Sequence, residues 1–70
     1  MLVELKVRDV KSGVIGSAEA DLDHEETSLM QQDYPLFCRV VESMCLEDCD
    51  RVVQVEAVVN KETQEVLFTR

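Results

Sequence analysis

The chain has 70 residues, of which 46% are hydrophobic and 31% are charged, and its formal net charge is −8. This composition is typical of one small folded domain, residues 1–70, and argues against a disordered chain. The negative charge also argues against direct binding to nucleic acid or to an anionic membrane, because both would repel such a surface.

The N-terminal part of the chain predicts a β-hairpin. Apolar and charged side chains alternate over residues 2–10, and residues 14–22 alternate again, as expected of strands with one solvated face. Ser12-Gly13 between them is a turn signal that places Val7 opposite Ala18. The pairs in this register are Val3–Leu22, Leu5–Ala20 and Val7–Ala18 on the inner face and Lys6–Glu19 on the outer face.

Two helix starts follow the hairpin. Asp23 with Glu26 three residues later fits a capping box, which predicts a short helical turn through Met30. Asp33-Tyr34-Pro35 combines a capping residue with a first-turn proline and predicts a longer helix from Pro35 to Glu47. Its expected core stripe is Phe37, Cys38, Val41, Met44 and Cys45, and its surplus apolar residues are Leu36, Val40 and Leu46.

The C-terminal part predicts a second hairpin, with strands over residues 51–60 and 66–70. If Val59 pairs with Val66, then Ala57 and Phe68 face each other in the core. The predicted fold is therefore α+β, a two-layer ββαββ domain. A four-stranded antiparallel sheet of two hairpins carries one main helix on one face, with the strand order undecided.

Some apolar residues of the predicted strands point away from the helix. If they cluster on the outer sheet face, they form an interface. The predicted dimer-interface residues are Val10, Ile15, Val52, Val58 and Leu67. One hypothesis is therefore a homodimeric structural or adaptor subunit that associates through this face.

Negative charge is concentrated in residues 19–50, which hold ten acidic residues and one basic residue and so carry a charge of −9. Such a surface attracts basic partners. The predicted partner-binding residues are Glu19, Asp21, Asp23, Glu25, Glu26, Glu47, Asp48 and Asp50. The leading hypothesis is a non-catalytic protein-interaction module that binds a basic surface. In size and charge the chain resembles small phage or mobile-element inhibitors that cover the nucleic-acid-binding surface of a target protein.

Catalytic and metal-site motifs are weak. Cys38, Cys45 and Cys49 could line one side of a helix, which leaves a small thiol- or metal-dependent protein as a third hypothesis, but their spacing differs from that of structural zinc sites. The acidic run from Asp21 lacks the glycine and the final glutamate of a calcium-binding loop. His24 is the only candidate base for a cysteine nucleophile. We therefore expect no enzyme activity, no cofactor and no metal.

The three cysteines are an odd number, and the first residues do not resemble a secretory signal. The expected compartment is therefore the reducing cytoplasm, with the thiols free.

Overall fold

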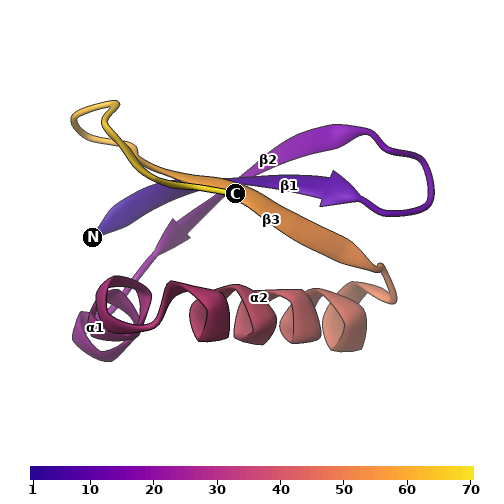
Figure 1. Cartoon of the computed structure of the whole chain (residues 1–70), viewed down its shortest axis with the longest axis horizontal. Helices are drawn as coiled ribbons and strands as arrows, with labels where there is room; N and C mark the ends of the chain where they lie inside the picture. Colours follow the sequence, from indigo (N-terminus) through magenta and orange to yellow (C-terminus); the bar gives the residue numbers. More distant parts are fainter.

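The computed structural model describes all residues from Met1 to Arg70. Its elements are β1 (Leu2–Asp9), β2 (Ile15–Asp21), α1 (His24–Gln32), α2 (Tyr34–Cys49), β3 (Val53–Asn60) and β4 (Val66–Thr69). The strands form one antiparallel sheet in the order β2-β1-β3-β4, and the two helices lie on one face of it (Figure 1). The predicted two-layer α+β fold is confirmed, and the short helical turn is a helix of its own.

Both helices begin where their capping residues predict. The Asp23 carboxylate accepts a hydrogen bond from the Glu26 backbone N–H at 2.8 Å, and the Glu26 carboxylate accepts one from the Asp23 N–H at 3.1 Å. Asp33 ends α1 and also begins α2, where its carboxylate accepts a hydrogen bond from the Leu36 N–H at 3.2 Å. α2 ends at Cys49 and is followed by the capping residue Asp50, which adopts the left-handed conformation with φ 52°. The chain therefore turns sharply between α1 and α2 without an intervening loop.

The core lies between the sheet and the two helices. Val3 and Leu5 of the central strand β1 are buried in it, and Met30 is the one buried residue of α1. The ring of Tyr34 stacks on Phe68 of β4 with a centroid separation of 4.4 Å, which closes one end of the core. The core cluster consists of Val3, Leu5, Leu22, Met30, Phe37, Val55 and Val58.

The register of the first hairpin differs from the prediction by two residues. Val7 lies opposite Gly16 instead of Ala18, and Lys6 lies opposite Ser17 instead of Glu19. The cause is a longer loop, in which the Asp9 carboxylate accepts hydrogen bonds from the backbone N–H groups of Lys11 and Ser12. A shift of two residues leaves each side chain on its predicted face, because the strand period is two.

The second hairpin contains a change of phase that the sequence pattern does not reveal. Val59 pairs with Val66 as predicted, but an irregularity in the β3–β4 pairing between Val58 and Val59 places Val58, not Ala57, opposite Phe68. Val58 is 0% exposed and belongs to the core, so its predicted outward orientation is wrong. The physical reason is a β-bulge at Glu56, which opposes no residue of β1 and reverses the alternation of faces beyond it.

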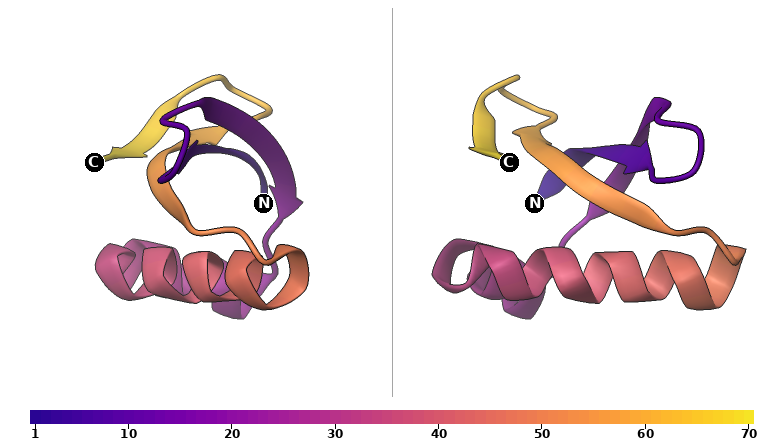
Figure 2. Two further views of the ribbon diagram at one scale, coloured as in Figure 1. Left: turned by 90° about the vertical axis from the view of Figure 1, so that its right-hand side faces the viewer. Right: turned by 45° about the vertical axis from the view of Figure 1, so that its right-hand side comes forward.

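Helix α2 packs mainly under β3 (Figure 2). The Glu42 carboxylate accepts a hydrogen bond from the backbone N–H of Val55 at 3.0 Å, which ties the helix to this strand. Phe37 is the buried anchor of α2, whereas Met44, which was expected in the core, is 53% exposed. Leu36, Val40 and Leu46 are exposed as well, so α2 carries more apolar surface than its contact with β3 uses.

Candidate functional site

An apolar trough runs along the inner face of β2, between this strand and α2. Its first part is a hollow of about 260 Å³ lined by residues of β1, β2, α1 and α2, among them Ala20, Leu29 and Met44. A second hollow of about 270 Å³ lies farther along β2 and shares Cys45 and Cys49 with the first. We call these two hollows together the β2 trough.

The trough exists because β2 has small inward side chains. Its inner positions are Gly16, Ala18 and Ala20, which pair with the inward residues of β1 and reach only a short distance toward the helix layer. Nearly the whole of β2 is exposed as a result. This part of the inner sheet face lacks the helix cover that β3 receives from α2.

Two carboxylates lie in this apolar lining. Of the twelve residues around the first hollow, ten are hydrophobic, and the other two are Glu26 of α1 and Asp48 of α2. Asp48 forms no ion pair, and Glu26 interacts only with the cap of its own helix. The second hollow contains one acid and one base, Asp9 and Arg51, which pair with each other at 3.0 Å. The trough therefore carries a net negative charge.

The predicted acidic residues fall into two groups and one outlier. Asp21, Asp23, Glu25 and Glu26 surround the start of α1, where negative charge favours a helix. Glu47, Asp48 and Asp50 surround the end of α2, where no basic residue occupies the last turn. Both groups border the trough through Glu26 and Asp48. Glu19 instead lies on the opposite sheet face, where its carboxylate pairs with the Lys61 ammonium at 3.2 Å.

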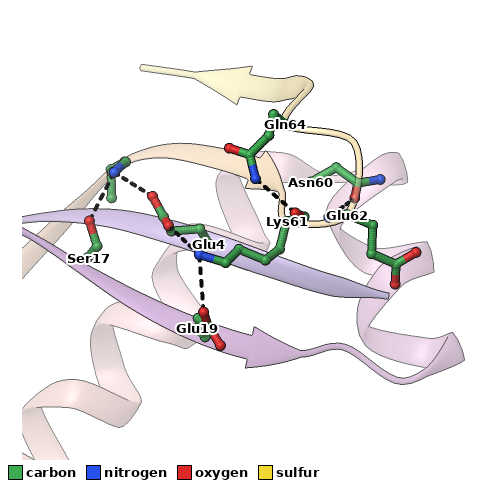
Figure 3. Close-up of polar contacts among 8 residues, drawn as sticks. Glu4, Ser17, Glu19, Asn60, Lys61, Glu62 and Gln64 are labelled. Carbon is green, nitrogen blue, oxygen red and sulfur yellow. Dashed lines mark hydrogen bonds and ion pairs between the residues drawn. The ribbon is translucent and has the colours of Figure 1, made fainter.

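A cluster of polar side chains lies on the outer sheet face (Figure 3). At its centre Glu4 forms ion pairs with Lys6 and with Lys61, the second at 3.3 Å, and the Lys6 ammonium donates a hydrogen bond to the Ser17 hydroxyl at 3.0 Å. These charged side chains occupy the place where the homodimer hypothesis needed an apolar patch. Of its five residues, Val58 is buried and Leu67 packs partly against the core. Val10, Ile15 and Val52 remain exposed at one end of the sheet, where the Val10 N–H donates a hydrogen bond to the Val52 carbonyl.

The Glu4 cluster predicts a defined pH dependence. Hydrogen bonds from Lys6 and then Lys61 hold the pKa of Glu4 below its ordinary value of 4.5. A carboxyl group whose pKa is lowered by folding stabilises the fold above its unfolded pKa and loses this effect as the pH falls through the folded pKa. We expect Glu4→Gln to unfold at lower denaturant concentration than the native chain at pH 7, and the difference to vanish in acid.

Chemical denaturation of both proteins at a series of pH values measures this difference. The series runs from about pH 7 to about pH 2, because carboxyl groups titrate within this range. Glu62→Gln is the control, because it removes one charge from the β3–β4 turn without breaking an ion pair. A gap between native protein and Glu4→Gln that persists at the acid end would contradict the assignment.

The three cysteines do not form a common site. Cys38 lies beside the buried Tyr34 hydroxyl, whereas Cys45 and Cys49 line the trough. Burial raises the pKa of the Cys38 thiol and of the Cys45 thiol, and the neighbouring Cys49 raises that of Cys45 further. Neither thiol is therefore activated as a nucleophile. No three side chains of the metal-ligating types gather at one point of the structure.

Comparisons with protein families, with curated proteins and with solved structures find no match to this chain. Neither helix has both the length and the hydropathy that a membrane-spanning helix needs. The trough is not among the features predicted from the sequence, although the sequence contains two signals of it. These are the small residues at alternate positions of β2 and the surplus apolar residues of α2, such as Val40 and Met44.

Proposed function

We propose that the chain is a non-catalytic protein-interaction module whose acidic surface binds a basic surface of another protein. The observation that carries the proposal is the end of α2, where Glu47, Asp48 and Asp50 lie at the negative pole of the helix without a basic residue in the last turn. Carboxylates at this position oppose the helix dipole and reduce stability. Residues that act against the fold are expected where they serve binding instead.

The basic surface that we propose as the target is one that binds nucleic acid. Such surfaces present clustered Lys and Arg side chains for phosphate groups, and a dense set of carboxylates can occupy the same positions. The acids at the start of α1 and at the end of α2 provide two such groups. On this proposal the module inhibits its target by covering that surface.

The test compares two double variants with the same net charge. Glu47→Gln with Asp48→Asn removes the acids at the end of α2, and Glu62→Gln with Glu65→Gln removes two acids of the β3–β4 turn. We expect the first pair to raise the free energy of unfolding by about 0.3–1 kcal/mol for each acid removed at low salt, because the helix dipole favours the change. We expect the same pair to bind its target less tightly than the control pair.

Binding is measured by capture of proteins on the immobilised chain from a nuclease-treated lysate at low and high salt. Captured proteins are then assayed for competition between the chain and a DNA or RNA oligonucleotide. Retention of nucleic-acid-binding proteins that the oligonucleotide displaces supports the proposal. Binding that is insensitive to salt, or equal in the two double variants, contradicts it.

A further inference from the structure

The helix layer covers only part of the sheet. Strand axes in a sheet are about 4.8 Å apart, so four strands span roughly 14 Å between the outer axes. A helix with its side chains is about 10 Å wide, and α2 packs under β3. α1 is a short helix of nine residues that meets α2 rather than running along β2. The inner face of β2 therefore has room for one more helix, and the β2 trough marks its place.

The length of the trough also fits a helix. β2 has seven residues, which extend over roughly 23 Å. A helix of about fifteen residues has the same length. The small inward side chains of β2, such as Ala18 and Ala20, leave the depth that larger side chains of an added helix would fill.

The lining defines the chemistry of the occupant. Apolar side chains, among them Leu29, Val40 and Met44, require an apolar face opposite them. Glu26 and Asp48 have no cationic partner within the chain and so require basic residues beside that face. A second copy of this chain does not meet this requirement, because it carries a net charge of −8 and would bring further carboxylates to the same rim.

We propose that the β2 trough is the docking site of a basic amphipathic helix from a partner protein. Its apolar face packs against β2 and α2, and its Lys or Arg side chains pair with Glu26 and Asp48. This inference rests on the proposed function and names the element of the partner that the acidic surface recognises. Recognition of a helix in a groove is a common mode of peptide binding.

The test uses a synthetic sixteen-residue peptide that places Leu at helical spacing and Lys at the other positions. A peptide of the same composition with Leu and Lys in strict alternation is the control for β-strand addition at the free edge of β2. Affinities are measured by calorimetry, and helix formation in the bound peptide by circular dichroism. We expect the helical peptide to bind and to gain helicity, and the alternating peptide to bind at least about tenfold more weakly, a difference of about 1.4 kcal/mol.

Two pairs of variants locate the site on the protein. Ala18→Phe fills the trough without changing the charge, and Ile15→Phe places the same ring on the opposite face of β2, at a position that lines neither hollow. Asp48→Asn removes a carboxylate of the trough, and Glu62→Gln removes one elsewhere. We expect Ala18→Phe to weaken binding of the helical peptide about tenfold or more and Asp48→Asn about threefold, with the two controls within about twofold of the native chain.

Equal binding to the native chain and to Ala18→Phe would overturn the docking site but not the acidic recognition, because the peptide would then adhere to the charged surface in general. Preference for the alternating peptide would overturn it in favour of strand addition at β2. A chain that sediments as a dimer, and as a monomer after Ala18→Phe, would overturn it in favour of a second copy. If peptide binding is lost in the double variant Glu47→Gln with Asp48→Asn but kept in Ala18→Phe, the docking site is overturned and the proposed function is still supported.

Discussion

Val58→Asp is expected to abolish the folded state at room temperature. Val58 is 0% exposed and lies in the core opposite Leu5 and Phe68. An unpaired carboxylate at a buried position belongs to the class of substitutions that cost more than about 4 kcal/mol. A single core in a chain of this length rarely supplies more than about 3–5 kcal/mol of stability, so this cost is enough to unfold it. Far-ultraviolet circular dichroism and urea denaturation at neutral pH measure the loss, and a cooperative transition close to that of the native chain would contradict the buried position.

A milder pair of substitutions gives a measurable version of the same test. Val58→Thr and Val59→Thr both keep the branched side chain that strands favour. Val58→Thr buries a hydroxyl group and should lower the free energy of unfolding by about 1–3 kcal/mol. Val59 lies on the other face of β3, so Val59→Thr should change it by less than about 0.5 kcal/mol. The reverse order of the two effects would mean that β3 continues without the bulge at Glu56.

Met30→Ala is the second substitution with a large expected effect. Met30 is 0% exposed and is the one fully buried residue of α1, and its neighbour Leu29 packs against the core only in part. Truncation of a buried methionine to alanine costs about 2–5 kcal/mol, because it leaves a cavity. Urea denaturation followed by circular dichroism measures the change.

The adjacent position provides the control for this prediction. Gln31 is exposed on α1, and Gln31→Ala keeps a residue that favours helices, so its effect should stay within about 0.5 kcal/mol. Amide hydrogen exchange then reports where stability is lost. Exchange in α1 should accelerate more than exchange in β1 if Met30 anchors this helix. A cost below about 1 kcal/mol for Met30→Ala would show that α1 does not depend on it.

The features that could be predicted from the sequence are those encoded locally. The helix starts depend on Asp23, Glu26 and Asp33, whose side chains bond backbone groups three residues away. The first strands follow from alternation, and one solvated face suffices to orient their side chains. The element types and their order therefore agree between sequence and structure.

The errors concern features that depend on distant parts of the chain. The turn of the first hairpin is two residues longer than predicted. In it the Asp9 carboxylate accepts hydrogen bonds from the Ser12 N–H and from the guanidinium of Arg51, which is distant in the sequence. Hydrogen bonds from these two groups also lower the pKa of Asp9. The bulge at Glu56 depends on pairing with β1, and the Glu56 carboxylate there binds Arg8 at 2.7 Å. Neither the longer turn nor the bulge changes the local alternation of apolar and polar residues from which the strands were predicted.

The candidate site could be predicted only in part. The acidic groups at the two helices follow from the sequence, but their common border with an apolar trough depends on how α1 and α2 pack against the sheet. Glu19 belongs to the same acidic segment of the sequence as the other acids, yet it pairs with Lys61 on the opposite sheet face. The density of charge along a sequence does not show on which sheet face a charged residue lies. The packing of the folded chain determines it.

The central position of β1 has a consequence for how the chain reaches its fold. β1 begins at Leu2, and its second partner β3 begins at Val53, so the middle of the sheet joins two segments that are about fifty residues apart in the sequence. Contacts between residues far apart in sequence require closure of a long loop and slow folding. During synthesis, β1 can pair with β2 early, but its other edge has no strand partner until β3 has left the ribosome. The first hairpin and the helices can form earlier, but the core closes only after β3, which supplies Val55 and Val58, has emerged.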